Sequence, residues 1–495
     1  MSKKLLIYSL PGALFLIQLL LISCHSPQKE KNPPPNIILI IADDMAWDDS
    51  GAYGHPSIRT PNIDRLAREG IRFDRAFLTT SSCSPSRSSI ITGKYPHQTG
   101  AQELHLPLPG DQVTFVEKLK AAGYWTASAG KWHLGEATKD KFDQVHVVGS
   151  LGFDLFPEFK QTNDSSLKND PSGCKSWIPT LRSRPKDKPF FLWLAAIDPH
   201  RGYQPDIIEN PHQPEDVRIP PYMPDNQEVR KDFTMYYDEI SRMDSYIGKA
   251  LSEIDSQGIA ENTLILFISD NGRPFPRDKT TLYDGGIKTP FIVRWPKKVK
   301  PGTSSQSLVS SVDIAATFSK LAGLEPEPGF EGVDFSPIFS NPDQKVRDII
   351  LAQAHWHDFD DHVRAIRNDR YKYIRNFYTD ITLSPPADAL KSPTFAALKK
   401  LRDSREITDA QNVIFRMPRP EEEFFDLDND PYELNNLIND PTYSKEINLL
   451  RSRLSDFQRV SGDSLPLQRT PDEFDRETGD KLPNWQKSRK PKNNM

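Results

Sequence analysis

The sequence is short of cysteine: among 495 residues only Cys24, Cys83 and Cys174 are present, too few for a disulfide framework. It also lacks an excess of charge of one sign, because 63 basic and 68 acidic side chains leave a formal net charge of -5. Such a balance argues against a dedicated nucleic-acid binder. Beyond residues 5–22 the sequence has no apolar run of the roughly 20 residues that a membrane span needs. With 37% hydrophobic and 26% charged residues, the composition is that of a soluble, folded chain.

The N-terminal segment reads as an export signal. Two lysines precede the apolar stretch 5–22, which ends just before Cys24, and a polar segment follows. The position of Cys24 resembles that of the lipidated cysteine of bacterial lipoproteins. We therefore expect residues 1–23 to be a signal peptide, Cys24 to carry lipid, and residues 24–35 to form a tether. An uncleaved N-terminal anchor helix is the alternative. In both cases we expect an exported protein attached to a membrane, in the periplasm or on the outer-membrane surface.

Continuous apolar runs that end in polar clusters recur along the chain. They lie at residues 36–42, 190–197 and 263–269. Runs of this kind are typical of strands buried on both faces of a parallel sheet. Between them, residues 62–69, 114–122 and 236–256 have helical spacing of apolar residues. The alternation predicts an α/β fold with a mostly parallel sheet, in which ligands bind beyond the carboxyl ends of the strands.

Polar side chains follow two of these runs directly. Asp43 and Asp44 come after the first, and Asp270 and Asn271 come after the third. A single acidic pair after a strand is often only a turn or a helix cap. Two such clusters at one edge of a sheet, however, form a set of three carboxylates and one amide without cysteine or histidine. This hard oxygen set suits Ca²⁺ or Mg²⁺ and would bind zinc poorly.

Residues 82–93, Ser-Cys-Ser-Pro-Ser-Arg-Ser-Ser-Ile-Ile-Thr-Gly, predict a short helix that starts near a cysteine. Pro85 fits the first helical turn and Gly93 fits the end. Cys83 then lies at the helix N-terminus, where free N–H groups favour developing negative charge. Arg87 follows one turn later on the same face, so its guanidinium can point back toward Cys83. By itself, the pattern fits a buried structural cysteine as well, which is the more common case.

This segment resembles the signature of the formylglycine-dependent (type I) sulfatases. Further resemblances to motifs of that family lie at residues 43–44, 130–135, 270–272, 279–286 and 424–437. The likeness runs from about residue 36 to about residue 458. It implies an alkaline-phosphatase-like α/β fold, with a mostly parallel sheet flanked by helices and a smaller C-terminal α+β domain that contains an antiparallel sheet.

The resemblance also implies how the chain is divided. We expect a catalytic domain at residues 36–345, a C-terminal subdomain at residues 346–465 and a tail at residues 466–495. Within the subdomain, the sequence itself predicts strands at residues 365–367 and 371–375, a polar loop at residues 378–411 and a helix at residues 444–458. The basic end of the tail is expected to be solvated.

The resemblance implies that Cys83 is oxidised by a maturation enzyme to formylglycine, whose hydrated aldehyde attacks the sulfur atom of the substrate. It also implies one Ca²⁺ ion, with Mg²⁺ a weaker choice. The ligands implied are Asp43, Asp44, Asp270, Asn271 and the modified residue 83.

Other catalytic roles are implied by the same motifs. Arg87, Lys131 and Lys279 are expected to hold residue 83 and to stabilise charge on the sulfuryl group. His200 is the candidate acid for the leaving group and His133 the candidate base, although these two roles could be exchanged. Weaker candidates for the substrate pocket are His105 and Asp198.

Several loop segments resemble the heparan N-sulfatase (sulfamidase) branch of the family, namely residues 81–87, 198–201, 219–225, 269–276 and 415–418. This likeness implies action on N-sulfoglucosamine in heparan or heparin. Lys279, however, stands where that branch has arginine, and residues 283–286 follow the general O-sulfatase pattern, so an O-sulfatase acting on an algal polysaccharide such as ulvan is the alternative. Remoter alternatives are a phosphohydrolase of the alkaline phosphatase superfamily and a non-catalytic glycan-binding lipoprotein.

Overall fold

The computed structural model describes residues 33–147 and 170–483. The expected signal peptide, the lipidated Cys24, most of the tether and the basic end of the tail lie outside these ranges. Within them, none of the helices combines the length and the apolar character needed to cross a bilayer.

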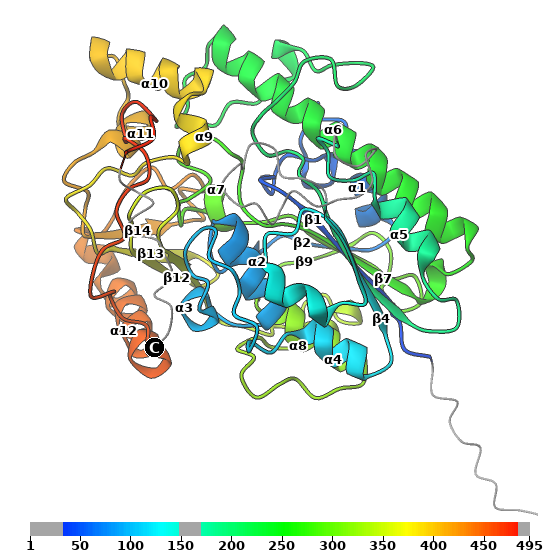
Figure 1. The fold of residues 1–495 in the computed structure, drawn as a ribbon. Helices are drawn as coiled ribbons and strands as arrows, with labels where there is room; N and C mark the ends of the chain where they lie inside the picture. Colours follow the sequence, from blue (N-terminus) through cyan, green and yellow to red (C-terminus); the bar gives the residue numbers. More distant parts are fainter. Residues whose placement is uncertain (1–32, 148–169, 484–495) are drawn as a thin grey trace, which may run out of the picture. The chain divides into compact units, whose positions relative to one another are not determined.

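A mostly parallel sheet of eight strands forms the centre of the part that the structure describes (Figure 1). In spatial order its strands are β5 (Gln144–Val147), β4 (Trp125–Gly130), β6 (Phe190–Ala195), β1 (Asn36–Ala42), β7 (Thr263–Ser269), β8 (Phe291–Arg294), β2 (Ile71–Phe73) and β9 (Thr303–Ser305). Only the β7–β8 and β2–β8 pairs are antiparallel. The three apolar runs of the sequence form β6, β1 and β7, which are neighbours, so the predicted parallel sheet is confirmed.

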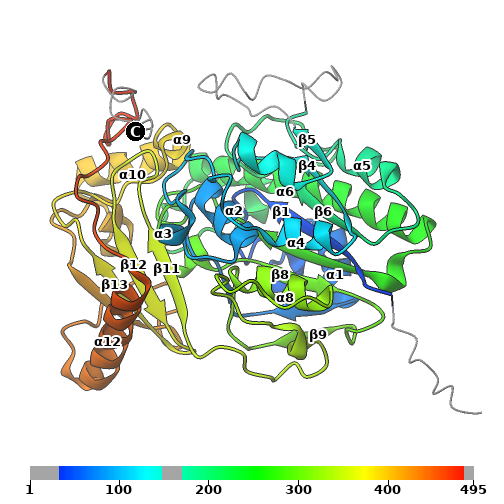
Figure 2. The ribbon, with the colours of Figure 1, turned by 60° about the horizontal axis from the view of Figure 1, so that its bottom comes forward.

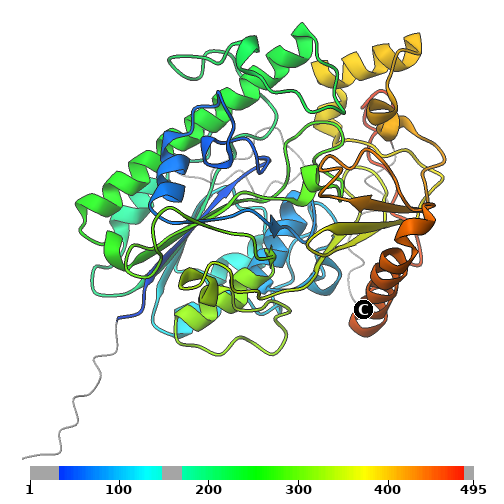
Figure 3. The ribbon, with the colours of Figure 1, turned by 180° about the vertical axis from the view of Figure 1, so that it is seen from behind.

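Helices cover both faces of this sheet, as Figures 1 and 3 show from opposite sides. Alternate side chains of β1 divide between two cores, with Ile37 and Leu39 in one and Ile38 and Ile40 in the other. The first core includes side chains of α2 (Cys83–Thr92), α4 (Phe115–Ala121) and α8 (Asp313–Leu321). The second includes side chains of α1 (Pro61–Arg68), α5 (Trp177–Ser183) and α6 (Gln227–Ser256). Burial on both faces explains why the strands are continuously apolar.

The C-terminal part forms a separate antiparallel sheet, visible beside the central sheet in Figure 2. Its strands, in order, are β11 (Ile350–Ala354), β12 (Val363–Arg367), β13 (Tyr371–Asn376) and β14 (Glu422–Asp426). One face packs against α12 (Ser444–Ser461), whose Leu450 and Leu454 share a core with Ile366 and Phe424. The other face, through Ile374, joins a core with residues of the central part. The expected antiparallel subdomain is therefore confirmed.

Shorter elements complete the described chain. They are the parallel pair β3 (Ala76–Phe77) and β10 (Val309–Ser310), and the helices α3 (Pro96–Thr99), α7 (Asp284–Ile287), α9 (Ala387–Leu390), α10 (Pro393–Ser404) and α11 (Asp409–Asn412).

The predicted polar loop at residues 378–411 was wrong, because α9 and α10 lie within it. Ser392 caps α10 by accepting a hydrogen bond from the Phe395 backbone N–H at 3.1 Å, and Pro393 follows at the first helical position. Phe395 and Leu398 are the buried side chains that hold the helix. An apolar stripe this narrow is easily hidden by the surrounding lysines and arginines.

The first part of the expected tail contacts the C-terminal sheet. The Trp356 indole N–H donates to the Pro471 carbonyl at 2.9 Å, and the Glu473 backbone N–H donates to the Asp358 carbonyl at 2.8 Å. Residues 466–483 thus lie along the loop that follows β11. The domain boundaries proposed from the sequence stay predictions.

Candidate functional site

The carboxyl ends of β1 and β7 bring four polar side chains together. Ala42 pairs with Ser269 in the parallel register, so the residues that follow each strand are neighbours in space. The Asp270 backbone N–H donates to the Ala42 carbonyl at 3.1 Å, which fixes this alignment. We call the resulting group the carboxylate cluster; its members, all fully buried, are Asp43, Asp44, Asp270 and Asn271.

Cys83 lies against this cluster at the first position of α2. Its sulfur is 3.8 Å from Asp44 Oδ1 and 3.5 Å from Asn271 Nδ2, and the residue is 2% exposed. Burial raises the pKa of the Cys83 thiol to about 12, and the carboxylates Asp43 and Asp44 also act to raise it. Such a thiol is not ionised near neutral pH, so the unmodified cysteine is a poor nucleophile in this setting.

Arg87 lies one turn after Cys83 on α2 and reaches Asp270, one of whose carboxylate oxygens lies within 4.8 Å of the Cys83 sulfur. Its Nε and Nη2 atoms each lie 2.7 Å from Asp270 Oδ2, and the side chain is fully buried. A guanidinium prefers this charged acceptor to a neutral thiol, because the pair is desolvated and hydrogen-bonded. Arg87 therefore holds a member of the carboxylate cluster.

Two lysines hold the other two carboxylates. Lys131 Nζ forms an ion pair with Asp43 Oδ2, and Lys279 Nζ lies 2.7 Å from Asp44 Oδ2. Burial opposes the charge on each lysine, but the adjacent carboxylate outweighs it and raises the pKa of both Lys131 and Lys279. Although burial also acts against the charge on Asp43, Lys131 holds the pKa of that carboxyl well below its usual range. Both lysines are therefore cations at neutral pH.

The cluster has the properties of a hard-cation site. Asp43 Oδ1 and Asn271 Oδ1 are buried and make no hydrogen bond within the described ranges, which is costly for an acceptor removed from water. The Asn271 amide nitrogen instead donates to Asp44 Oδ1 at 2.6 Å and to Asp270 Oδ1 at 2.8 Å. Burial and the neighbouring Asp43 raise the pKa of Asp270 to about 7 despite Arg87. A divalent cation would satisfy these oxygens and favour the ionised carboxylates.

The sequence candidates His133 and His105 contact each other. His133 Nε2 lies 2.8 Å from His105 Nδ1, and both residues have a positive φ, 57° and 67° respectively. Non-glycine residues rarely adopt this backbone region, and strain of this kind is concentrated at functional sites. Burial, together with the charge of Lys131, lowers the pKa of His133 well below its usual value. His133 is therefore neutral near pH 7.

His200 faces the cluster from the segment that follows β6. Its Nδ1 lies 3.0 Å from the Arg201 carbonyl, so a proton on Nδ1 would be donated there. Its Nε2 is 3.8 Å from Asp44 Oδ2 and the ring is 19% exposed. This nitrogen can thus reach both the cluster and solvent.

Asp198, a sequence candidate for the substrate pocket, has other partners. Its two carboxylate oxygens accept hydrogen bonds from Arg242 of α6 at 2.6 and 2.9 Å, and the residue is 1% exposed. Asp198 therefore anchors α6 and does not present its carboxylate to a ligand.

Sequence reasoning missed two residues of the C-terminal subdomain, His357 and Asp388. His357 Nδ1 lies 2.7 Å from Ser82 Oγ, the residue that precedes the cysteine, and burial followed by the charge of Lys279 lowers the pKa of His357 well below its usual value. Asp388 Oδ2 lies 3.8 Å from His200 Nε2. No motif surrounds either residue, and only the packing of the subdomain on the central part brings them to the site.

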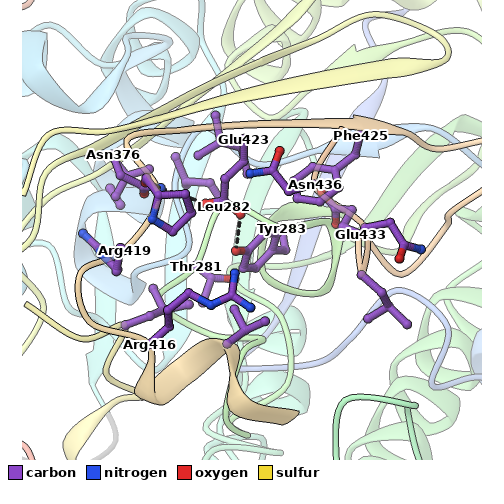
Figure 4. Close-up of a pocket in the computed structure, with 18 of the residues that line it drawn as sticks. Thr281, Leu282, Tyr283, Asn376, Arg416, Arg419, Glu423, Phe425, Glu433 and Asn436 are labelled. Carbon is purple, nitrogen blue, oxygen red and sulfur yellow. Dashed lines mark hydrogen bonds between the residues drawn. The ribbon is translucent and has the colours of Figure 1, made fainter. Parts of the chain in front are cut away.

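The chain segment that follows Lys279 forms one wall of a cavity of about 420 Å³, shown in Figure 4. Thr281, Leu282 and Tyr283 line it on one side, and the inner face of the antiparallel sheet lines it on the other. The Tyr283 hydroxyl donates to Glu423 Oε2 at 2.7 Å, as the dashed line marks. This bond ties the Lys279 segment to β14.

Replacing Tyr283 with phenylalanine is expected to lower the free energy of unfolding by about 1–3 kcal/mol, because Glu423 loses one buried donor. Urea unfolding would measure the change. Tyr373→Phe is the matched control, since that hydroxyl donates to the more exposed Glu422 and should cost less. An equal loss of stability in the two variants would contradict a specific contribution of the Tyr283–Glu423 hydrogen bond.

Comparisons with known proteins agree with this geometry. A protein-family model described as Sulfatase matches residues 35–324, and one described as N-sulphoglucosamine sulphohydrolase, C-terminal, matches residues 275–414. The chain is 32% identical over 465 residues to an ulvan-active sulfatase of Formosa agariphila, covering 88% of this chain and 76% of the relative. It is 28% identical over 476 residues to N-sulphoglucosamine sulphohydrolase of Homo sapiens, covering 86% and 90%. A solved complex with the substrate D-glucosamine-2-N,6-O-disulfate has the same fold, with a TM-score of 0.65 at 22% identity over 88% of this chain and 99% of that chain.

Proposed function

The chain belongs to the sulfatase family and is a sulfuric ester hydrolase, and we propose that it releases sulfate from a sulfated polysaccharide or oligosaccharide. The observation that carries this proposal is the position of Cys83 against a buried carboxylate cluster, each carboxylate of which is paired with a cation. Relatives named for sulfated glycans support the substrate class.

We further propose that residue 83 acts as formylglycine and that one Ca²⁺ is bound by residue 83 together with the carboxylate cluster, Asp43, Asp44, Asp270 and Asn271. The oxygen-only donor set and the two buried oxygens that accept no hydrogen bond, Asp43 Oδ1 and Asn271 Oδ1, support this choice of ion. In this form, the site would supply a hydroxyl nucleophile of lowered pKa and positive charge beside a sulfate oxygen.

The fixed charges around residue 83, together with a bound divalent cation, would favour an anion there. Six charged side chains surround it: Asp43, Asp44, Asp270, Arg87, Lys131 and Lys279. Three are acidic and three are basic, so their formal sum is zero when all are ionised. A divalent cation would therefore leave the site with a local charge of +2, which complements a sulfate ester or an N-sulfate and the charge that develops as the S–O or S–N bond breaks.

The histidine environments support the assignment made from the motifs. His200 Nε2 faces the cluster and the side chain is partly exposed, so it can carry a proton to the leaving oxygen or nitrogen. His133 is buried and held neutral, so it is in the form that can accept a proton. His105, 2.8 Å from His133 Nε2, would orient that ring.

For the substrate, we propose N-sulfoglucosamine in heparan or heparin. The C-terminal family model supports it, because the matched residues 275–414 include Lys279, His357 and Asp388. An O-sulfated algal polysaccharide such as ulvan is the second candidate. It is favoured by Lys279, an amine where the N-sulfatase branch has arginine, and by the similarity to an ulvan-active sulfatase.

Sulfate release from a panel of defined N- and O-sulfated oligosaccharides tests this proposal. We expect release from at least one member and none of phosphate from matched phosphate esters. Preference for N-sulfoglucosamine would support the first candidate, and preference for ulvan fragments the second. Release of phosphate alone would favour a phosphohydrolase, and release of neither from the matured protein would favour a glycan-binding protein.

We also propose that the protein is exported and lipid-anchored through Cys24, and that a maturation enzyme acts on Cys83. Metabolic labelling with palmitate followed by cell fractionation would test the anchor. Label in the wild-type protein and its absence from a Cys24→Ala variant would support the proposal, whereas unlabelled protein in the cytoplasmic fraction would contradict it.

A further inference from the structure

Asp388 lies beside the carboxylate cluster, and its own carboxylate has no role in the proposed reaction. Its Oδ2 lies 3.8 Å from His200 Nε2, the nitrogen assigned to the leaving group. The Asp388 side chain is 31% exposed, whereas Asp44, the other carboxylate near that nitrogen, is fully buried. Asp388 therefore lies on the solvent side of His200, where the sugar of a bound substrate would extend.

The position of Asp388 is well defined by its surroundings. It belongs to the short helix α9, whose first backbone N–H, that of Ala387, donates to Asp358 Oδ2 at 2.9 Å. Leu390 at the end of α9 is buried in the core beneath the antiparallel sheet. In addition, the Thr280 hydroxyl donates to the Ser384 carbonyl at 3.2 Å, which ties the approach to α9 to the Lys279 segment. A carboxylate held in this way can select a ligand without ordering a loop.

A second metal ion is a poor explanation for this carboxylate. Donor atoms of Asp44, His200 and Asp388 do lie within 4.8 Å of one another. However, Lys279 Nζ is 2.7 Å from Asp44 Oδ2, the same oxygen that faces His200. Asp44 is already a ligand of the proposed Ca²⁺ ion, and its Oδ2 atom is taken by Lys279, so Asp44 has no oxygen left for a second ion. An organic hydrogen-bond donor therefore fits Asp388 better than a second metal ion.

We propose that Asp388 binds a hydroxyl group on the sugar carbon next to the one that carries the scissile sulfate, and that it selects against a second anionic substituent at that position. The inference rests on the proposed function. The short separation of His200 Nε2 and Asp388 Oδ2 suits two substituents on adjacent ring carbons, the leaving nitrogen or oxygen and a hydroxyl group. A carboxylate forms a strong hydrogen bond with a hydroxyl group but repels a neighbouring sulfate or uronate.

Binding to a Cys83→Ala background tests this role without turnover. The probes are N-sulfoglucosamine, its 3-deoxy analogue and inorganic sulfate, each followed by calorimetric titration. With Asp388 present, we expect the 3-deoxy analogue to bind about 10-fold more weakly than the parent sugar. In an Asp388→Ala variant the two sugars should bind almost equally, while the affinity for inorganic sulfate should change less than about twofold.

Charge selection is tested with Asp388→Asn and 3-O-sulfated N-sulfoglucosamine. In the Asp388→Asn variant, the affinity for this doubly sulfated sugar relative to that for N-sulfoglucosamine should rise by about 10-fold. The reason is that the repulsion between the Asp388 carboxylate and the added sulfate is removed. Asp403→Asn, an exposed acid of α10 that is 67% exposed, is the matched control and should change neither ratio. Three results would each overturn the inference. The affinity ratios of the sugars could be unchanged in both Asp388 variants, or these variants could lose as much affinity for inorganic sulfate as for the sugars. N-sulfoglucosamine could also bind no more tightly than inorganic sulfate. Sulfate release by the wild-type enzyme tests the proposed function separately.

Discussion

Sulfate release is expected to fall by about four to six orders of magnitude when Cys83 is replaced with alanine, because this removes the side chain that we propose as the source of the nucleophile. In the structure the thiol is 2% exposed and has a pKa raised to about 12, so without modification it would contribute little to catalysis. Mass spectrometry of the active wild-type enzyme should therefore find the peptide that contains position 83 about 18 Da lighter than its thiol form, the difference between a thiol and an aldehyde.

Cys174 provides the matched control for this experiment. It is also fully buried, and its thiol donates to the Ser172 carbonyl at 3.2 Å, outside the carboxylate cluster. Cys174→Ala is expected to retain sulfate release within about threefold, with only a packing cost. A fully active enzyme whose residue 83 is an intact thiol would show that the nucleophile has been assigned wrongly.

Replacing Asp270 with alanine is expected to lower both activity and stability. Activity should fall by about a thousandfold or more, because the proposed calcium ion loses a ligand. The free energy of unfolding should fall by about 3–5 kcal/mol, because the fully buried Arg87 loses the carboxylate that lies 2.7 Å from its Nε and Nη2 atoms. Sulfate release and denaturant unfolding of this variant would measure the loss of activity and of stability, and calcium titration would measure the loss of calcium affinity.

Asp313, which forms an ion pair with Arg347, provides a control that separates the loss of a calcium ligand from the loss of a buried ion pair. Asp313 is fully buried and Arg347 is 12% exposed, so Asp313→Ala also breaks a buried ion pair. This pair is not part of the carboxylate cluster, and we expect Asp313→Ala to lose stability while the folded enzyme keeps its calcium affinity and specific activity. If Asp270→Ala behaved in the same way, Asp270 would be a structural residue and the calcium assignment would fail.

Much of the architecture could be predicted from the sequence because it depends on local patterns. The apolar runs that form β1, β6 and β7 are continuous because both faces of each strand are buried. The helix at Cys83 ends at Gly93, which has a φ of 63°, as expected for a left-handed C-terminal residue. Asp43, Asp44, Asp270 and Asn271 gather at one edge because parallel strands end together, so the carboxylate cluster could also be predicted.

Other features were decided by contacts between distant segments. Spacing along α2 placed Arg87 one turn from Cys83, but only the packing of α2 against the segment after β7 shows that its hydrogen-bond partner is Asp270. In the same way, Arg242 of α6 engages Asp198 and removes it from the substrate side. A buried charged side chain pairs with the group that best compensates the free-energy cost of its desolvation. That group can be identified only from the packing of the helices and strands.

The sequence by itself determined the sheet, the position of the cysteine and the set of oxygen ligands, because each depends on strand and helix patterns that act over a few residues. Only the tertiary structure decided which C-terminal residues reach the site. His357 and Asp388 lie outside every recognisable motif, and they come close to Ser82 and His200 because the antiparallel sheet and α9 pack on the central part. Packing of a second sheet depends on the shape of whole surfaces, which no short pattern of residues encodes.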